Sequence, residues 1–320
     1  MNKKNLLIGN LNCVFLNKKI KQNLLDYWDE FVKNIFVSDY SLGRFPHFLL
    51  KDVNIKYISK DEPAIIGKFV KDTVLEIEQV LINNTLVEKD ESYQTAPSSL
   101  FIYLLKNHTL LYLGEHRGYP QINTFVSFLK RGINREKAKY FKSLSTGKKR
   151  EEKIKIYENF PDLYINFTPM PMRKKIEEQF KGIKKIKKIK INQFLQNGDF
   201  NASSFVGDNK EILKYLKSEK IGFEVESPKD TESAITLIKE ISESNEANFT
   251  VDGITESGIN QTISDEGIKY VQPIEDYDPT AKTIDNAAKI YSKYSEDLDL
   301  NEIPRIEQKN SDEMIKKAFD

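Results

Sequence analysis

Residues 181–191, KGIKKIKKIKI, thread four isoleucines through six lysines and contain no acidic residue. Isoleucine at this density predicts a β-strand, because β-branched side chains fit the half-buried surface of a sheet. The lysines must stay in water or meet an anion, since burial of an unpaired ammonium group costs a prohibitive amount of free energy. The stretch therefore predicts the edge or face of a sheet with a cationic front, and what that front meets is the main question about the chain.

The rest of the chain has the composition of a soluble protein with a substantial core. Of its 320 residues, 39% are hydrophobic and 30% are charged, and the length allows two domains. Its apolar runs fall short of the roughly 18 residues of a membrane helix, and the start, MNKKNLLIGNLNCVF, favours a first strand over a signal peptide. The single Cys13 excludes an internal disulfide framework and suits a reducing compartment. We therefore expect a cytoplasmic protein that does not insert into a membrane.

The net charge of +1 conceals an uneven distribution of charge along the chain. Residues 131–191 carry 19 Lys and Arg against 7 Asp and Glu, a net charge of +12. Residues 192–320 carry 14 against 27, a net charge of −13. This asymmetry points to a polyanionic partner for the basic block. The competing interpretation is that the two blocks neutralise each other, within one chain or across a dimer.

The periodicity of apolar residues predicts an α+β fold without internal repeats. The clearest signals are a hairpin over 98–105 and 109–113 and an amphipathic helix over 18–35, whose apolar stripe carries Trp28. Residues 73–82 fit either a helix or a strand. The remaining expected strands are at 5–16, 45–50, 53–58, 64–70, 163–168, 181–191, 222–226, 247–251 and 267–271. Helices are expected at 209–218, 230–242, 281–294 and 312–319, and a further helix starts at 121–130 and can run on past Gly132. Residues 169–180 are expected to form a turn with a short basic helix, 197–199 a turn and 295–304 an acidic linker.

The sequence changes character around residue 150. Residues 143–149 are rich in small and basic residues and are predicted to form a mobile surface loop. We therefore expect two domains, each a mostly antiparallel sheet with packed helices. The N-terminal α+β domain covers residues 1–150, and the C-terminal α+β domain covers residues 151–320. The second domain contains the basic strand at 181–191 and ends in acidic C-terminal helices.

The residue patterns of common enzyme classes are missing from the sequence. It has no Walker phosphate loop, dinucleotide fingerprint, nucleophile elbow or His-Glu-x-x-His pair. Its three histidines are scattered, so a zinc site is not expected, and a solvated loop is the favoured setting of His116. Residues 102–114 contain pieces of a GIY-YIG motif, and 151–153 and 224–226 contain pieces of a carboxylate nuclease site, but neither set is complete. We therefore predict no catalytic residue, no metal site and no cofactor, and do not expect an enzyme.

The basic block has the residue types of a phosphate-binding surface. Lysine dominates it, and lysine is a point charge rather than a fork that reads bases. This favours contact with the DNA backbone, without sequence preference and with a steep dependence on salt. Few aromatic residues interleave with the lysines, so duplex DNA is favoured over single strands, whose binding usually adds stacking. The predicted nucleic-acid contacts are Arg131, Arg135, Lys148, Lys149, Arg150, Arg173, Lys174, Lys175, Lys181, Lys184, Lys185, Lys187, Lys188 and Lys190.

Three stretches of the chain resemble the RexA-like exclusion proteins of phage lambda, in the same order and at similar spacing. Together they cover about half of the chain, and none is a catalytic signature. The stretches are DES at 90–92 with PSSLFI at 97–102 and the helix ending at Leu129; INFTPM at 165–170 with Gly182 and the Lys/Ile strand; and FTV at 249–251 with SDEG at 264–267 and VQP at 271–273.

The resemblance implies a dimeric, two-domain protein that binds duplex DNA without strong sequence preference. It also implies a role in antiviral defence, through abortive infection or superinfection exclusion, together with a membrane-channel partner protein encoded nearby. The first 40 residues and residues 140–160 have no counterpart in this resemblance, which assigns no individual DNA contact. The basic residues named above therefore rest on charge alone.

Two functions of other classes stay open. The first is a metal-dependent effector nuclease of a defence system, with a diverged metal site. The second is a protein-interaction sensor module without DNA binding, whose basic block meets an acidic partner or the acidic third of its own chain.

Overall fold

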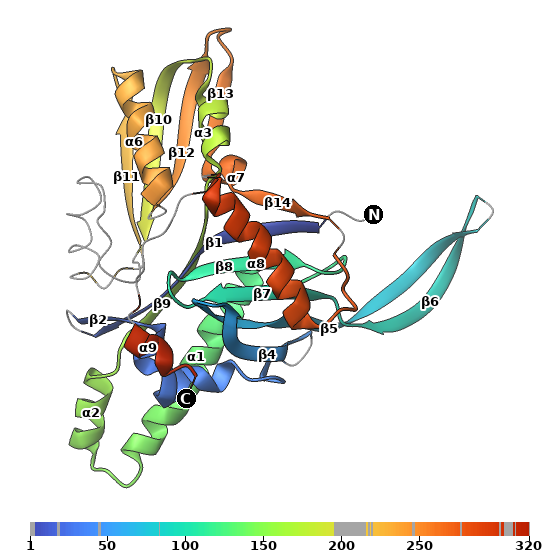
Figure 1. The fold of residues 1–320 in the computed structure, drawn as a ribbon, viewed down its shortest axis with the longest axis vertical. Helices are drawn as coiled ribbons and strands as arrows, with labels where there is room; N and C mark the ends of the chain where they lie inside the picture. The colour runs from blue at the N-terminus through green and yellow to red at the C-terminus, as the bar shows by residue number, and fades with distance from the viewer. Residues whose placement is uncertain are drawn as a thin grey trace.

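The computed structural model describes residues 4–17, 20–43, 46–82, 84–194, 216, 218, 220–244, 247–275, 277–300, 302–303, 310 and 312–319. Within these residues the chain is an α+β fold of two antiparallel sheets with packed helices and helices near the C-terminus, as the sequence predicted (Figure 1). A ten-stranded sheet forms the body, and a four-stranded sheet extends from one end of it. No helix in the described part of the chain is long and apolar enough to cross a membrane.

The large sheet is built around β1 (Lys4–Asn17), which pairs with four other strands. Its first half lies between β14 (Val271–Ile274) and β8 (Thr109–Gly114). Its second half lies between β9 (Asp162–Pro169) and β2 (Ile20–Asn23). Residues 8–16 of β1 are all buried. Protein therefore covers both edges and both faces of this strand.

From β8 the sheet continues outward, and one of its strands leaves it. β5 is 21 residues long, and only its first half pairs inside the sheet. Its second half pairs with β6 (Thr85–Thr95) alone, and this two-stranded hairpin projects from the body (Figure 1). The ambiguous residues 73–82 are thus a strand with largely exposed sides, which lacks the alternation of a half-buried strand. Outward from β8, the strands in order are β7 (Ser98–Leu104), β5 (Glu62–Ile82), β4 (His47–Ser59) and β3 (Ser41–Leu42).

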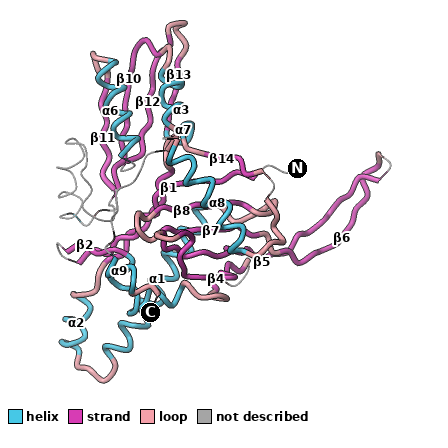
Figure 2. The backbone as a smooth tube through the Cα atoms, in the orientation of Figure 1, coloured by secondary structure: helices cyan, strands magenta, loops and turns pink. Residues whose placement is uncertain are grey.

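Two hydrophobic cores lie on the two faces of the large sheet. Along β7, side chains alternate between them, so Tyr103 joins one core and Ile102 joins the other. The first core is closed by α1 (Ile122–Ser145) and by three short helical turns over residues 24–35. The second core is closed by α8 (Thr283–Asp299). The body therefore has three layers, with the sheet between helices (Figure 2).

The small sheet has one covered face. α3 (Arg173–Phe180) and α6 (Thr231–Ser244) pack on it, and Ile186, Ile189 and Ile191 point into the core between them. The lysines of the same strand lie on the opposite side. The order of strands is β11 (Lys220–Glu226), β10 (Ile183–Phe194), β12 (Ala247–Thr255) and β13 (Asn260–Ser264).

The repeat in β10 explains how its isoleucines share one face. Ile183, Ile186 and Ile189 are three residues apart, whereas side chains on one face of a regular strand are two apart. The pairing of β10 with β12 shifts register twice, just after Ile183 and just after Ile186. Each shift places two residues of β10 opposite one of β12. Two lysines therefore fit between successive isoleucines, and the predicted sheet face with a cationic front is confirmed.

The chain near the N-terminus differs from the expected single helix over 18–35. Residues 20–23 form β2, and the helical part is a 3₁₀ turn (Leu24–Tyr27), a π turn (Trp28–Val32) and a second 3₁₀ turn (Lys33–Ile35). The apolar stripe nevertheless faces the core as predicted, and Trp28 is fully buried. Tertiary packing, rather than a regular helical repeat, sets the local geometry here.

Several other predicted boundaries move. The helix that the sequence starts at 121–130 and allows to run on past Gly132 ends at Ser145. α2 (Arg150–Glu158) follows, so the predicted loop at 143–149 is shorter. The start of the linker expected at 295–304 belongs to α8, and part of the strand expected at 267–271 belongs to the one-turn α7 (Asp265–Ile268). The helix expected at 312–319 is α9 (Asp312–Lys316). The turn at 197–199 and most of the helix at 209–218 lie outside the described residues.

The division at residue 150 stays a prediction about independent folding units. The strands themselves divide differently between the sheets. β9, β14 and α8 all follow residue 150, yet they complete the large sheet and one of its cores. The small sheet comes from residues 183–264.

Gly9 on β1 tests the close packing of this strand against β9. A Cβ at Gly9 would lie 2.3 Å from the ring of Phe167 and 2.5 Å from the backbone oxygen of Thr168, which its own pairing holds in place. We expect Gly9→Ala to lower the free energy of unfolding by at least about 2 kcal/mol, measured by urea denaturation. Gly222→Ala, whose nearest contact is a side-chain atom at 3.3 Å, should change it by less than about 1 kcal/mol. Equal losses in the two variants would contradict this packing.

Glu62, at the start of β5, gives the fold a pH dependence. One carboxyl oxygen is buried without a hydrogen-bond partner among the described residues. Burial raises the pKa of Glu62 from 4.5 to about 7, although Lys106 opposes the shift. The folded chain therefore holds this proton more tightly than the unfolded chain, and stability falls as the pH rises from 4.5 through 7. We expect Glu62→Gln to be about 2 kcal/mol more stable than the wild type at pH 8 and similar at pH 4.5, by urea denaturation. A constant difference across this range would contradict the assignment.

Candidate functional site

The predicted DNA contacts fall into two groups at opposite ends of the molecule (Figure 1). The first group lies on α1, on α2 and on the turn between them, which we call the basic hairpin (residues 122–158). Its members are Arg131, Arg135, Lys148, Lys149 and Arg150. The second group lies on or beside the small sheet and consists of Arg173, Lys174, Lys175, Lys181, Lys184, Lys185, Lys187, Lys188 and Lys190. One block of sequence thus forms two separate surfaces.

The basic hairpin is anchored at one end and projects at the other. The first half of α1 packs into the core of the large sheet through Phe125 and Ile133. The second half runs beyond the sheet, and α2 returns beside it (Figure 1). Phe141 of α1 meets Tyr157 of α2 edge to face, with ring centroids 5.8 Å apart. Gly147, at φ 75°, forms the turn between the helices.

Positive charge dominates the basic hairpin, which carries 11 Lys and Arg against 4 Glu. The buried Glu136 neutralises part of this positive charge, because its carboxylate lies 2.7 Å from Lys139 Nζ and 4.0 Å from Arg135 Nε. Lys137 turns inward and donates to the backbone oxygen of Pro161 at 2.8 Å, and this burial lowers its pKa. The remaining exposed cations form no ion pair within the described residues. They are Arg131, Lys142, Lys148, Lys149, Arg150, Lys153 and Lys155.

The outer side of β10 carries Lys184, Lys185, Lys187, Lys188 and Lys190, which we call the lysine face. Unlike the seven unpaired cations of the basic hairpin, Lys188 and Lys190 of the lysine face meet carboxylates of the same chain. Lys188 Nζ lies 2.6 Å from Glu224 and 3.2 Å from Glu226 on β11, and Lys190 Nζ lies 3.7 Å from Glu224. Hydrogen bonds to both carboxylates raise the pKa of Lys188, and the bond from Lys188 lowers the pKa of Glu224. The acidic third of the chain therefore supplies anions to the basic strand.

The other members of the second group are dispersed around the small sheet. Lys187 donates to Asn260 Oδ1 at 2.9 Å, whereas Lys184 and Lys185 are exposed. Lys181 is also exposed, in the turn after α3. Arg173, Lys174 and Lys175 form the start of α3, which packs on the covered face of the sheet. That segment and the lysine face therefore lie on opposite sides of the small sheet.

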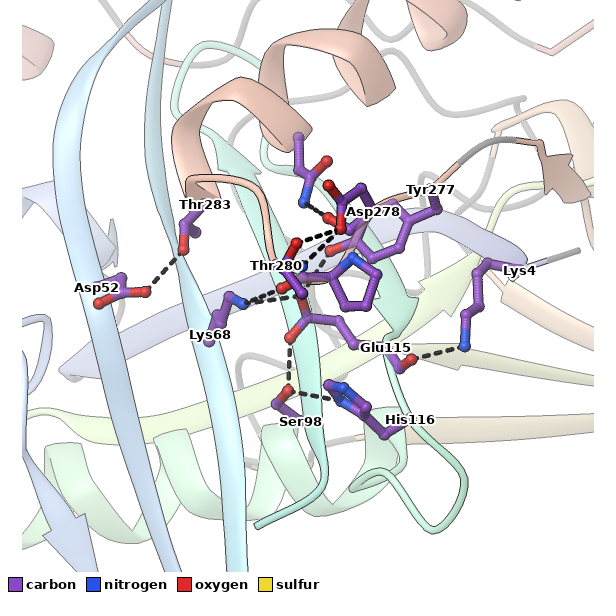
Figure 3. A network of polar contacts seen from close by, with 12 residues as sticks. Lys4, Asp52, Lys68, Ser98, Glu115, His116, Tyr277, Asp278, Thr280 and Thr283 are labelled. Carbon is purple, nitrogen blue, oxygen red and sulfur yellow. Dashed lines mark hydrogen bonds and ion pairs between the residues drawn. The ribbon is translucent and has the colours of Figure 1, made fainter. Parts of the chain in front are cut away.

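A buried polar cluster that the sequence did not predict joins the C-terminal segment to the large sheet (Figure 3). At its centre is Glu115, which is 1% exposed. Its carboxylate accepts hydrogen bonds from Tyr277 Oη at 2.6 Å and from Ser98 Oγ at 2.5 Å. Lys68 Nζ lies 3.1 Å from the same carboxylate, and Lys4 Nζ donates to the backbone oxygen of Glu115 at 2.6 Å. Three segments that are distant in sequence thus satisfy one buried charge, and a fourth satisfies the backbone oxygen of the same residue.

The cluster also orients His116 at the surface. Ser98 has a single hydroxyl proton and donates it to Glu115, so the contact of 3.2 Å between Ser98 Oγ and His116 Nδ1 requires Nδ1–H to donate. The neutral ring therefore keeps its lone pair on Nε2. Ser98 is not an activated nucleophile in this arrangement, because its proton goes to an ion-paired carboxylate rather than to a free imidazole. His116 is exposed, as the sequence predicted, but it is held in place rather than free in a loop.

Among the described residues, no three His, Cys, Asp or Glu side chains gather as they would to hold a metal ion. No family model, curated protein or solved structure matches the chain. The resemblance to RexA-like exclusion proteins therefore rests on the three stretches of sequence alone.

Removal of the Lys68 ammonium group would leave Glu115 buried without a cation. Loss of one partner of a buried ion pair costs about 3–5 kcal/mol, so we expect Lys68→Met to lower the free energy of unfolding by about 3 kcal/mol in urea denaturation. The double variant with Glu115→Gln removes both charges and should be more stable than Lys68→Met alone. Lys51→Met is the matched control, because its partner Asp39 is 65% exposed and such pairs contribute at most about 1 kcal/mol. Equal losses of unfolding free energy in Lys68→Met and Lys51→Met would show that the buried ion pair stabilises the fold no more than the exposed one.

Proposed function

We propose that this chain is a non-enzymatic protein that binds double-stranded DNA without strong sequence preference, chiefly through the basic hairpin. The observation that carries the proposal is the exposed positive charge of that hairpin, which projects from the body and in which seven exposed cations form no ion pair among the described residues. An exposed cation without an ion-pair partner can neutralise a phosphate of the DNA backbone. The counterions that were bound to that phosphate are then released, which favours binding.

The geometry of the basic hairpin favours backbone contact over the reading of bases. Its tip carries Lys148, Lys149 and Arg150, and further cations lie along both helices. Lysine donates as a point charge, which suits phosphates at any sequence. Tyr157 is 70% exposed on α2 and is the aromatic side chain that a single strand could stack on. Single-stranded DNA is therefore the competing ligand for this surface.

The lysine face supports a second, narrower role. Its ion pairs with Glu224 and Glu226 favour an interaction between the basic strand and the acidic third of the chain, as in the sensor hypothesis. DNA that bound there would have to displace these carboxylates. We therefore propose that Lys188 and Lys190 of the lysine face are held by carboxylates of their own chain, and that the basic hairpin is the DNA contact.

The wider setting of the proposal comes from the resemblance to RexA-like exclusion proteins. It comprises a cytoplasmic homodimer in antiviral defence, acting by abortive infection or superinfection exclusion with a membrane-channel partner protein encoded nearby. Phage plating on cells that carry the gene, with and without the neighbouring reading frame, tests this setting. Equal plating on these cells and on cells without the gene would count against it.

Charge reversal at the tip of the basic hairpin tests the DNA contact. We expect Lys148→Glu, Lys149→Glu and Arg150→Glu together to weaken binding to a random 20-base-pair duplex by about 100-fold at low salt, because three phosphate contacts become repulsive. The slope of log affinity against log salt should become shallower by roughly 2–3, since each contact contributes about 0.9. Fluorescence anisotropy over a salt series measures both quantities. Binding to the single strand of the same sequence should be weaker than binding to the duplex.

The matched control reverses the same number of charges on the lysine face, through Lys184→Glu, Lys185→Glu and Lys187→Glu. At about 0.1 M salt its loss of affinity should stay below about tenfold, because the Debye length there is about 10 Å and charges farther from the bound DNA are screened. If only this variant loses binding, the lysine face is the contact and our assignment is wrong. If the wild type binds no DNA at low salt, or cuts plasmid in the presence of Mg²⁺ or Mn²⁺, the proposed function is wrong.

A further inference from the structure

A cleft of about 810 Å³ lies where the β5–β6 hairpin leaves the large sheet. Its walls come from Lys71 and residues 73–75 of β5, from residues 95–97 at the end of β6 and after it, and from residues 116–118 after β8. Pockets for small ligands commonly have volumes of about 300–1,000 Å³. The cleft therefore has the size of a small-molecule site, and it is separate from both the basic hairpin and the lysine face.

Basic side chains from two of these segments meet in the cleft. Lys71 comes from β5, and His116 and Arg117 come from the turn after β8. None of the residues that line the cleft carries a carboxylate. The nearby Asp72 follows Lys71 in the strand, and its carboxylate accepts a hydrogen bond from Gln94 at 2.9 Å. The cleft is thus a cationic concavity, which favours an anionic ligand.

The position of His116 is fixed by the buried cluster behind the cleft. Its Nδ1–H donates to Ser98, which in turn donates to Glu115, and Lys68 pairs with that carboxylate (Figure 3). Nε2 is therefore the ring nitrogen left for a ligand. It can accept a hydrogen bond from a protonated phosphate oxygen when the ring is neutral, and it can donate one to a phosphate when the ring is charged. A fixed ring also loses little conformational freedom on binding.

The same cleft has an apolar wall. Leu75 lines it on the same side of β5 as Lys71 and is 53% exposed, and Pro97 also lines it. Apolar side chains next to cations fit a ligand that joins an anionic group to a flat apolar ring. Arg117 suits a phosphate better than a single negative oxygen, because its planar group can donate two parallel hydrogen bonds.

From this arrangement we propose that the cleft at the base of the β5–β6 hairpin binds the phosphomonoester group of a nucleotide-sized ligand. Arg117, Lys71 and His116 contact the phosphate, and the base lies against Leu75 and Pro97. Two sources offer this chemistry: a free mononucleotide and the 5′-phosphorylated end of an oligonucleotide.

Isothermal titration with adenosine 5′-monophosphate and adenosine tests the site. We expect the monophosphate to bind at least about tenfold more tightly than adenosine, since a charged hydrogen bond contributes about 1.5–3 kcal/mol and each 1.4 kcal/mol is tenfold. Arg117→Gln and Lys71→Gln should each weaken this binding by at least about tenfold. Lys60→Gln is the matched control, because Lys60 is an exposed lysine in the turn just before β5, far along the strand from the cleft. The affinity of this variant for adenosine 5′-monophosphate should equal that of the wild type.

A second arm separates the two sources of the phosphate. It compares a tetranucleotide with a 5′-phosphate and one with a 5′-hydroxyl, on the variant with the reversed tip of the basic hairpin, so that the duplex site contributes little. Preference for the 5′-phosphate without binding of the mononucleotide supports the proposal with a nucleic-acid end as the ligand. If neither phosphorylated ligand binds, or if the Arg117 and Lys71 variants bind like the wild type, the proposal is wrong. This outcome leaves the duplex site untouched, since duplex binding is measured separately.

Discussion

The hydrogen-bonding requirement of β1 is the constraint on which the rest of the structure depends. Its residues are buried, so nearly every backbone amide and carbonyl needs a partner within the protein. Those partners come from β2, β8, β9 and β14. The chain must therefore return to β1 repeatedly, and each return closes a loop. The basic hairpin lies in the loop between β8 and β9, and the small sheet lies in the loop between β9 and β14. Both candidate surfaces are thus insertions whose two ends are fixed to one strand.

This arrangement separates charges that are continuous in sequence. The basic block of residues 131–191 passes through β9 on its way from the basic hairpin to β10, and that strand holds the two surfaces at opposite ends of the molecule. The lysine face then pairs with β11, whose carboxylates lie directly across from it. The basic hairpin packs on the sheet through α1, and seven of its cations stay exposed without ion pairs among the described residues. Identical residue types therefore have different electrostatic settings, and the difference comes from strand pairing rather than from composition.

Local patterns predicted the parts of the fold that local interactions determine. The hairpin of β7 and β8 and the alternation of apolar and charged residues on β10 followed from residue type and spacing. The mixed 3₁₀ and π turns at residues 24–35 did not, because the core selects their geometry. The strand at 73–82 was ambiguous because most of its described side chains are exposed, so the sequence lacks the alternation of a half-buried strand. The ion pairs of Lys188 and the cluster around Glu115 could not be predicted, because each depends on segments that approach only after the sheets have formed.

The pairing of β1 with β14 can form only after most of the chain has been synthesised on the ribosome. β14 begins about 250 residues after β1 ends. At about 5–20 residues per second, the nascent chain carries β1 for about 12–50 s before its last partner has been made. During this time the edge of β1 at Lys4–Leu7 is uncovered, and an uncovered strand edge favours wrong pairing between chains. The N-terminal strand that organises the finished protein is thus open to wrong pairing until most of the chain has been made.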